Sequence, residues 1–467
     1  MKKLTNKKNT SPEQASVLVG LLWCMALLGV VVIGLLHTSR IDLMVQKNYG
    51  DRIQAHYLAI AGIEKTKALL YRDARQRSQT GRNHSGELYD SPENFRDVHF
   101  GRGQFRIIRQ GSDTEGGGLV YGVSDEESRL NVNYASFEQI SNLYQMTPQI
   151  AAAILDWRDE DNQVTPGGAE AEYYESLRPP SLPRNGPLQT VRELLMVRGV
   201  SREMLYGSDK DPTRRIGTGT DARGQSDSGW ADLLTVNSSV ENVSGTGQER
   251  VNIQSADENT LTSVRGITSE IAKAIVAHRN QNQFESILNL LDVNAVQNQN
   301  QPGAPGNQGG NPNNPGGQPS PQGGPGPNQP VPNPSGPKVV SEDLLLSIAD
   351  DITVQSGTQI PGLVNVNTAE LEVLICLPGV TRAVAHSIIS YRRANGFLSN
   401  VAYLLRVPGM TREIAKQLAP LVCVRSETYR ILCEGRIDSS RVTHRIQETV
   451  HVGLRRVTTV AYREDDL

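Results

Sequence analysis

Residues 15–36 read ASVLVGLLWCMALLGVVVIGLL, and this uncharged stretch decides how the rest of the chain is arranged. At about 1.5 Å per residue, a helix of this length crosses a hydrocarbon core of about 30 Å. Four lysines and a single acid precede it: Lys2, Lys3, Lys7, Lys8 and Glu13. Because positive charge is retained on the cytoplasmic side of a membrane, we expect the N-terminus in the cytoplasm and everything after residue 40 outside it.

A cleaved secretory signal is the alternative for this stretch. Such a signal has a shorter apolar core, followed by a cleavage site of the small-x-small type. Here the apolar run continues into His37-Thr38-Ser39-Arg40, which offers no good site of that kind. The sequence therefore favours a retained anchor.

The helical pattern continues beyond the apolar stretch. Apolar residues recur at steps of three or four: Ile41, Val45, Tyr49, Ile53, Tyr57 and Ile60. No proline follows before Pro92, so we predict one helix from about Ser16 to Arg77, roughly 90 Å long. Its outer half is amphipathic, and its apolar stripe must pack on another element, for which a sheet is the simplest choice.

The bulk composition describes a multidomain chain. With 467 residues and 37% hydrophobic content, it is long enough for two or three domains with cores of their own. Its formal charge of −3 shows no excess of lysine and arginine of the kind that binds phosphate backbones, so nucleic acid is not expected as a partner. The eight histidines are scattered, and the sequence has neither a GxSxG nor a P-loop motif, so we do not expect an enzyme.

The cysteines leave two possibilities open. Cys24 lies in the apolar stretch, and the other three cysteines lack the paired CxxC spacing of a zinc site. Cys423 and Cys433 are the nearest pair in sequence and could form a disulfide outside the cytoplasm. The alternative is that these two and Cys376 are buried thiols.

One pattern occurs three times in the middle of the chain. A short apolar and amide segment precedes an apolar helix at Leu130–Asn133, Val251–Gln254 and Val364–Asn367. Each helix then meets a tight connection and a second helix, and further connections of this type follow. These connections are Gln145–Thr147, Val197–Ser201, Val264–Thr268, Leu377–Thr381 and Val407–Thr411. They resemble helix-hairpin-helix motifs.

Helix-hairpin-helix motifs of DNA-binding proteins offer backbone N–H groups at a helix N-terminus to a phosphate. Such a site usually needs Gly-x-Gly in the connection, so that the two backbones can come close. Here the second glycine is replaced by residues that cap the following helix: Ser201, Thr268, Thr381 and Thr411. Four arginines could still form a basic face: Arg382, Arg392, Arg393 and Arg412. Arginines on a helix more often form a solvated surface, so structural packing is favoured over DNA binding.

The first repeat carries an acidic, glycine-rich block. It comprises Asp156–Asp161, Gly168–Glu170, Glu172–Tyr174, Asn185–Leu188 and Arg192–Leu194. Several carboxylates that converge on a loop suit a hard cation with oxygen ligands, such as calcium. The candidate ligands are Asp159, Asp161, Glu170 and Glu172. A solvent-facing acidic loop is the alternative.

The N-terminal arrangement resembles type IV pilins and pseudopilins, and the acidic block closely resembles the signature of the K-type minor pseudopilins of type II secretion. The resemblance implies that a prepilin peptidase cuts after Ala15 and leaves Ser16 as the new N-terminus. Most family members have glycine before the cut and glutamate at the fifth mature position, where this chain has Ala15 and Gly20. Absence of that glutamate is typical of K-type subunits and suits the tip of a filament, because the glutamate is thought to pair with the N-terminus of a preceding subunit.

The resemblance also implies a function. It predicts a structural subunit that caps the pseudopilus tip and helps to nucleate pseudopilus assembly for protein export, with calcium bound in its helical domain. The implied partners are the I- and J-type minor pseudopilins, the pseudopilus, the inner membrane and the prepilin peptidase. The implied location is a single pass through the inner membrane with the bulk of the chain in the periplasm. The alternative from another class is a membrane-anchored helix-hairpin-helix DNA-binding protein of the competence type.

The predicted fold class is α+β: a long N-terminal transmembrane helix packed on an antiparallel pilin-like sheet, with a large inserted all-α domain of helix-hairpin-helix or SAM-like units. Alternating residues predict strands at 103–110, 119–123, 428–436, 441–452 and 455–463. An uncharged stretch of Gly, Pro, Asn and Gln predicts a flexible tether between two helical units. The expected segments are a leader (1–15), a spine helix (16–80), pilin-like strands (81–130), a first helical unit with the acidic loop (131–230), a second unit (231–292), the linker (293–340), a third unit (341–424) and closing strands (425–467).

Overall fold

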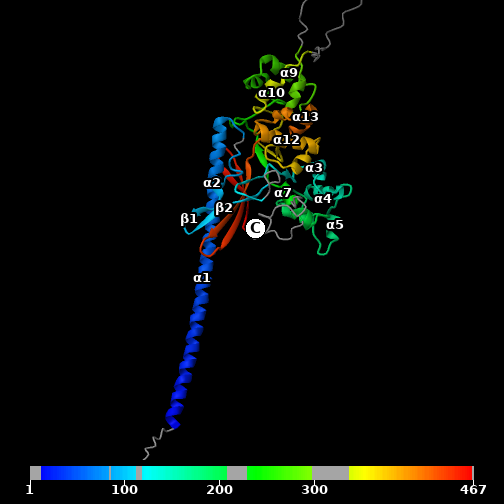
Figure 1. The fold of residues 1–467 in the computed structure, drawn as a ribbon. Coiled ribbons are helices and arrows are strands. Elements are labelled where there is room, and N and C mark those ends of the chain that lie inside the picture. Colours follow the sequence, from blue (N-terminus) through cyan, green and yellow to red (C-terminus); the bar gives the residue numbers. More distant parts are fainter. Residues whose placement is uncertain (1–11, 84–85, 112–117, 208–228, 297–335, 465–467) are drawn as a thin grey trace, which may run out of the picture.

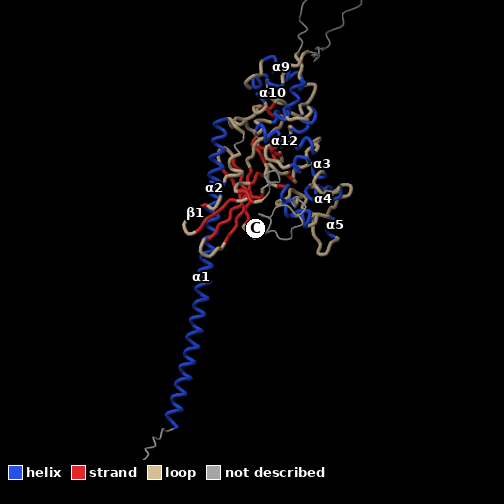
Figure 2. The backbone as a smooth tube through the Cα atoms, viewed as in Figure 1, coloured by secondary structure: helices blue, strands red, loops and turns tan. Residues whose placement is uncertain are grey.

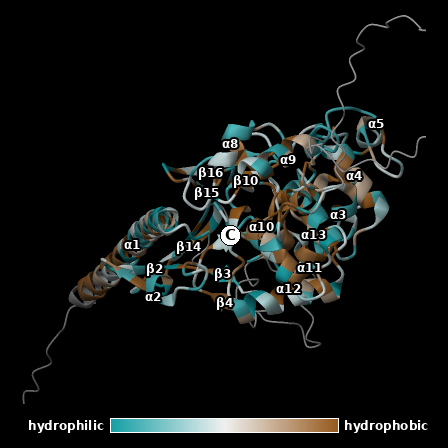
Figure 3. Ribbon diagram, turned by 90° about the horizontal axis from the view of Figure 1, so that it is seen from above, coloured by the Kyte–Doolittle hydropathy of each residue, from teal (hydrophilic) through white to brown (hydrophobic). Residues whose placement is uncertain are grey.

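The computed structural model describes residues 12–83, 86–111, 118–207, 229–296 and 336–464. Its first element, α1 (Pro12–Thr80), is a single helix of 69 residues and about 100 Å, so the prediction of one continuous helix is confirmed. The first part of α1 stands clear of the rest of the protein (Figure 1), and exposed large apolar side chains recur on it from Val17 to Tyr57. Figure 3 shows that hydrophobic residues predominate in this free part of the helix. By length and composition, α1 can cross a membrane.

An antiparallel sheet covers the outer part of α1 (Figure 2). In the described part of the chain it has six strands. Its order is β1 (Val98–Phe100), β2 (Gly103–Ile107), β14 (Thr428–Ile437), β15 (Thr443–Val452) and β16 (Val457–Arg463), with β5 (Ser124–Asp125) paired to the start of β14. Arg106 of β2 and Glu434 of β14 are register partners 328 residues apart in sequence. Strands from before and after the helical region therefore close one sheet, as predicted.

The predicted strand at 119–123 does not join this sheet. Its first two residues form β4 (Leu119–Val120), which pairs with β3 (Arg109–Gln110) in a ladder of their own. Val123 packs instead into the core between α1 and the sheet, in the same apolar cluster as Phe95 of the short helix α2 (Pro92–Phe95). Alternation over five residues was too short a signal to distinguish a sheet strand from a local hairpin.

Glycines allow α1 to lie directly on β14. A Cβ atom at Gly435 would collide with the backbone oxygen of Ala55, and one at Gly62 would collide with the Cys433 thiol. The ion pair between Lys67 on α1 and Glu448 on β15, at 2.7 Å, adds a polar contact to this packing. The spine helix and the sheet therefore form one body with a shared core.

The inserted helical domain repeats one order of elements, and the described residues contain three copies of it. Each copy opens with a two-residue strand that pairs in parallel with the strand that closes it. The pairs are β6 (Leu130–Asn131) with β7 (Leu234–Thr235), β9 (Val251–Asn252) with β10 (Ile352–Thr353), and β12 (Val364–Asn365) with β13 (Val422–Cys423). The strands β8 (Ser239–Glu241) and β11 (Gln359–Pro361) pair outside these units.

Between the opening and closing strands of each unit lie two helices joined by a hairpin, a 3₁₀ helix and a further helix. The first unit contains α3 (Phe137–Ser141), α4 (Pro148–Arg158), η2 (Val191–Met196) and α6 (Arg202–Tyr206), with the additional helices α5 (Ala171–Glu175) and α7 (Trp230–Leu233). The second contains α8 (Glu258–Ser263), α9 (Ser269–Arg279), η3 (Ile287–Asp292) and α10 (Glu342–Ile348). The third contains α11 (Leu371–Ile375), α12 (Arg382–Asn395), η4 (Val401–Arg406) and α13 (Arg412–Leu418). One apolar core extends through all of them, from Leu130 to Val424.

The structure corrects the expected boundary between the second and third units. The low-complexity stretch lies inside the second unit, because α10 and β10 follow it and β10 pairs with β9, which opens that unit. Asn294 and Lys338 pair with each other where the chain leaves and re-enters the unit. The second unit therefore extends to Thr353, and the third begins at Val364. Residues 297–335 lie outside the described part of the chain.

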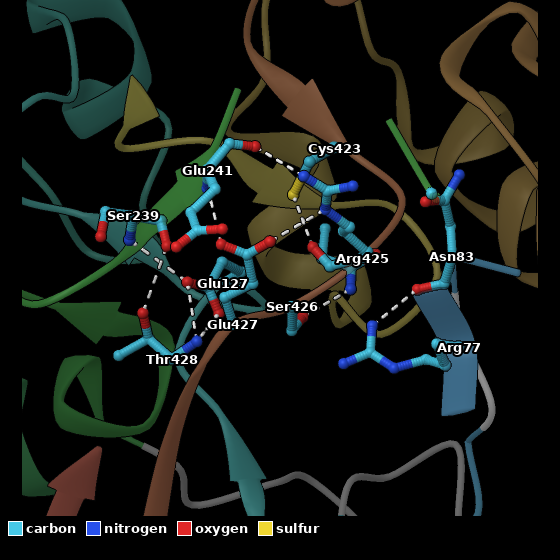
Figure 4. Close-up of polar contacts among 12 residues, drawn as sticks. Arg77, Asn83, Glu127, Ser239, Glu241, Cys423, Arg425, Ser426, Glu427 and Thr428 are labelled. Atoms are coloured by element: carbon cyan, nitrogen blue, oxygen red, sulfur yellow. Dashed lines mark hydrogen bonds and ion pairs between the residues drawn. The ribbon is translucent and has the colours of Figure 1, made fainter. Parts of the chain in front are cut away.

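A buried polar network joins the helical domain to the sheet (Figure 4). The Arg425 guanidinium pairs with Glu427 at 3.0 Å and donates to the backbone oxygen of Glu241 at 2.6 Å. The Glu127 carboxylate accepts from the backbone N–H groups of Ser239 and Thr428. Burial, and then the neighbouring Asp125 carboxylate, raise the pKa of Glu127 well above its usual value. The two parts of the protein therefore meet across specific polar contacts.

Candidate metal centre

The acidic block is an insertion into the repeated unit. The start of η2 lies 33 residues after Arg158, the last residue of α4. The equivalent connection takes 8 residues from Arg279 to η3 and 9 residues from Arg392 to η4. The first unit thus has the same strands and helices as the other two, which form the common frame of the units, and adds a loop after its second helix.

Three carboxylates meet where this loop leaves α4. Asp156 lies on α4, Asp159 caps the C-terminal end of the same helix, and Glu170 lies at the N-terminal end of α5. One oxygen atom from each lies within 4.8 Å of the others. Asp156 is fully buried, and Glu170 is only 3% exposed.

Part of the oxygen set points into the protein without a donor. Asp156 Oδ1 accepts a hydrogen bond from the backbone N–H of Thr165 at 3.1 Å. Asp156 Oδ2 and Asp159 Oδ1 are buried and accept no hydrogen bond from any described residue. Buried oxygens of this kind are costly unless a cation or proton compensates them.

The electrostatics also favour a cation. Burial, followed by the charges of Asp156 and Asp159, raises the pKa of Glu170 to about 7. Burial, followed by Asp161 and Asp156, also raises the pKa of Asp159. Because like charges and desolvation both oppose ionisation here, a divalent cation would stabilise the ionised form of the group.

The surrounding frame holds the carboxylates close together. A Cβ atom at Gly168 would collide with Asp156 Oδ2, so only glycine fits there. Arg198 donates to the Gly168 backbone oxygen at 3.0 Å. The rings of Trp157 and Tyr174 pack edge to face, 5.1 Å apart, between α4 and α5. The loop is therefore fixed to the helices that carry the acids.

The structure brings together two of the four residues named from the sequence, Asp159 and Glu170. Asp161 is exposed and accepts from the backbone N–H of Gln163 at 2.7 Å, but its charge still raises the pKa of both neighbours. Glu172 is exposed on α5 and lies outside the group. Sequence reasoning missed Asp156, although it opens the same acidic stretch and lies three residues before Asp159, which places it on the same side of a helix.

The hairpins of the helical domain carry the predicted caps. The hydroxyl groups of Thr268, Thr381, Thr411 and Ser201 each accept from the backbone N–H three residues further on. The connections turn through a residue of positive φ, which is glycine in four of them and Gln145, at φ +61°, in the first unit. The bulk of the capping residue thus occupies the place where Gly-x-Gly hairpins admit a phosphate.

The arginines of the second helices serve the frame. Arg392 donates to the backbone oxygen of Val366 at 2.8 Å. The equivalent Arg279 donates to Ile253 and Ala256, and Arg158 makes the same pair of bonds in the first unit. On the surface, the charges of the other arginines are balanced by acids: Arg382 pairs with Glu372 at 2.9 Å, and Arg412 lies 3.8 Å from Glu342. Of the four arginines that the DNA-binding hypothesis required, Arg392 thus bonds to the backbone, and Arg382 and Arg412 lie near acids of the protein itself.

Two histidines of the helical domain, and the three cysteines outside α1, show no arrangement typical of a catalytic site. His278 stacks on Phe284, and His386 is exposed. Cys376, Cys423 and Cys433 are free buried thiols, which decides between the two possibilities left by the sequence.

Comparisons with known proteins match these features. The family model described as type II secretion system protein K matches residues 120–206, which include the whole carboxylate group. The type II secretion system protein K of Klebsiella pneumoniae is 31% identical over 163 residues, covering 32% of this chain and 47% of that protein. The protein of the same name from Pectobacterium carotovorum subsp. carotovorum is 23% identical over 212 residues, covering 44% of this chain and 62% of that protein. The family model therefore matches the part of the chain that contains the candidate metal centre, and both relatives are similar to the chain over part of their length.

Two further matches extend beyond this region of the chain. The helix-hairpin-helix motif model matches residues 246–300 and 362–423, which fall in the second and third units. A chain in the crystal structure of the GspK–GspI–GspJ complex from the type 2 secretion system of enterotoxigenic Escherichia coli is similar with a TM-score of 0.42 and 12% identity, over 92% of this chain and 100% of that chain. The chain spans about half to three-fifths of the length of the curated relatives quoted above.

Proposed function

We propose that this chain is a minor pseudopilin, a structural subunit and not an enzyme, which enters the pseudopilus through α1 and serves protein export. The observation that carries the proposal is the division of α1 into two parts. Its first part exposes large apolar side chains from Val17 to Tyr57, and its outer part is buried under the sheet. An apolar surface of this extent requires a membrane or neighbouring helices to cover it.

The proposed location is a single pass through the inner membrane, with the sheet and the helical domain in the periplasm. The lysines before the apolar stretch and the lack of charge within it support this orientation. A prepilin peptidase is proposed to cut between Ala15 and Ser16. Both residues fall within the bounds of α1, and their side chains lie outside the described part of the chain.

The proposed position is the filament tip, where the subunit caps the pseudopilus and nucleates it together with I- and J-type minor pseudopilins. Gly20 stands at the fifth position of the proposed mature chain, where a glutamate would otherwise pair with a preceding subunit. The helical domain extends beyond the C-terminal end of α1 (Figure 1), so it would obstruct a subunit stacked above it. Both features favour the subunit with no predecessor.

Calcium is the proposed cofactor of the acidic loop. Asp156, Asp159 and Glu170 would provide carboxylate oxygens, and the exposed Asp161 is close enough to contribute charge. Calcium prefers oxygen ligands and tolerates irregular geometry, which suits carboxylates carried on a loop and two helix ends. The ion would neutralise the group and fix the loop to α4 and α5.

The first test is the N-terminal mass of the protein extracted from membranes with and without prepilin peptidase. We expect a chain that begins at Ser16 only when the peptidase is present. The tip complex is tested by co-purification of this chain with I- and J-type subunits from cells that produce all three proteins. A variant that lacks residues 16–57, the exposed part of α1, is the control. An intact Met1 terminus under both conditions would refute the pseudopilin proposal. Binding to duplex DNA with a steep salt dependence would support the competence-type alternative instead.

A further inference from the structure

A second group of potential metal ligands lies outside the acidic loop, at the contact between α1 and the sheet. It consists of His56 on α1, His444 on β15 and Glu464, which directly follows β16. His56 and His444 are 388 residues apart in sequence. Three separate parts of the chain therefore converge on one point.

The three ligand atoms face one another at short distances. His56 Nδ1 lies 3.3 Å from His444 Nε2. Glu464 Oε1 lies 2.7 Å from His56 Nδ1 and 3.1 Å from His444 Nε2. Two nitrogen atoms bound to Zn²⁺ at about 2.0–2.1 Å, with a tetrahedral angle between them, lie about 3.3–3.4 Å apart. The observed nitrogen separation already has this value, and a small shift of the carboxylate completes the set.

The environment is that of a metal site with an open position. Tyr462 donates to the other carboxylate oxygen, Glu464 Oε2, at 3.1 Å, which fixes the orientation of the ligand. The side chains of His56, His444 and Glu464 are 27%, 23% and 40% exposed, so water can supply a fourth ligand. Two imidazoles and one carboxylate suit zinc and related transition metal ions better than calcium, which prefers oxygen ligands.

The site lies where α1 first becomes covered by the sheet. Ala55 is fully buried against Gly435, whereas Ile53 and Tyr57 are exposed on the other side of α1. Gly435 is also the register partner of His444. An ion here would join the spine helix, a central strand and the last described residue of the chain.

We propose that His56, His444 and Glu464 bind a divalent transition metal ion such as Zn²⁺, which clamps α1 to the sheet and to the end of β16. This site is separate from the carboxylate group of the acidic loop and does not depend on the proposed role in secretion. The competing arrangement has no metal: both imidazoles donate to the same carboxylate oxygen, and the two nitrogens approach each other only for that reason.

The test uses the full chain in detergent with Asp156→Asn and Glu170→Gln, so that the acidic loop cannot hold the probe. After dialysis against micromolar ZnCl₂ and then against zinc-free buffer, we expect about one retained Zn²⁺ per chain by elemental analysis. His56→Gln or His444→Gln should weaken Zn²⁺ binding by at least about 100-fold, because loss of a direct ligand exceeds the 10- to 100-fold effect of losing a supporting partner. His99→Gln, on a histidine side chain that is 75% exposed, is the matched control and should retain the ion.

Folding and coordination are checked separately. Far-UV circular dichroism shows whether each variant is folded, and Co²⁺ added to the protein with both histidines intact should give the visible absorption of a four-coordinate site. No retained zinc in the folded background protein, or equal retention by the folded His444→Gln variant, would overturn the proposal in favour of the metal-free carboxylate bridge.

Discussion

Replacing Arg425 by methionine tests whether the buried polar network between the helical domain and the sheet stabilises the protein. Arg425 is 5% exposed, and its guanidinium makes the 3.0 Å ion pair with Glu427 and the 2.6 Å hydrogen bond to the Glu241 backbone oxygen. Methionine keeps most of the volume of the side chain but removes the charge. Glu427, itself 7% exposed, then loses its principal counter-charge.

The expected cost follows from what remains around Glu427. Its carboxylate still accepts from the Glu241 backbone N–H at 2.6 Å, and His451 Nε2 lies 4.0 Å away. Breaking a buried ion pair by removing one partner costs about 3–5 kcal/mol, and the remaining donor places this case at about 3 kcal/mol. The double variant Arg425→Met with Glu427→Gln removes the stranded charge, so its cost should fall to about 1 kcal/mol, near that of a single lost hydrogen bond.

Urea denaturation of the full chain in detergent measures these values. Two of the three tryptophans, Trp157 and Trp230, are buried in the helical domain, and the third, Trp23, is already exposed on α1. The change of tryptophan fluorescence in urea therefore follows mainly the helical domain, while far-UV circular dichroism follows the whole chain. Arg382→Met is the control: the Arg382 side chain is 62% exposed and pairs with Glu372, whose side chain is 40% exposed, so its loss should cost less than about 1 kcal/mol. The reasoning is refuted if Arg425→Met costs no more than this control, or if the double variant is no more stable than the single one.

Four further outcomes are expected. Gly168→Ala should abolish the rise in melting temperature that is expected from the proposed calcium binding, because its Cβ atom would displace Asp156 Oδ2; melting curves with and without Ca²⁺ measure this. Calcium affinity measured by titration calorimetry should fall about tenfold from pH 8 to pH 6, because the pKa of Glu170 is about 7 and its proton competes with the ion. In the absence of calcium, the same raised pKa means that the folded state holds a proton which the unfolded chain has lost, so stability should fall as pH rises from about 4.5 to about 7. Gln145→Gly should raise the free energy of unfolding by up to about 1 kcal/mol, because Gln145 has the positive φ that glycine has in the other hairpins. The urea midpoint should rise with it.

The parts of the fold that the sequence predicted have strong local signals. An apolar run followed by an amphipathic one has the helical period throughout, and it predicted α1 almost to its last turn. The alternating residues of β14 and β15 predicted long strands. The boundary of the second unit had no such signal. The strands that define it, β9 and β10, have two residues each, and composition alone suggested that the low-complexity stretch was a divider.

The residues of the candidate sites could likewise be predicted only where they lie close together in the sequence. The sequence could name Asp159 and Glu170 as candidate ligands because acids and glycines cluster there, but placing Asp156 beside them depends on its burial on α4, which no composition reveals. His56 and His444 could not be paired from spacing, because they come from the spine helix and a strand near the end of the chain. Only the closure of the sheet on α1 places them together.

The three units of the helical domain share one arrangement of strands and helices, and two of them add long insertions to it. In all three units, an arginine at the end of the second helix donates to the backbone just after the opening strand, so this contact belongs to the frame. The acidic loop enters the first unit between that arginine and η2, and the low-complexity stretch enters the second unit between η3 and α10. Both insertions fall in surface connections, where added residues break no hydrogen bond of the frame. A hairpin whose caps and arginines already serve the frame has little left with which to bind a phosphate, whereas a loop inserted beside it can gain a carboxylate site without disturbing the packing.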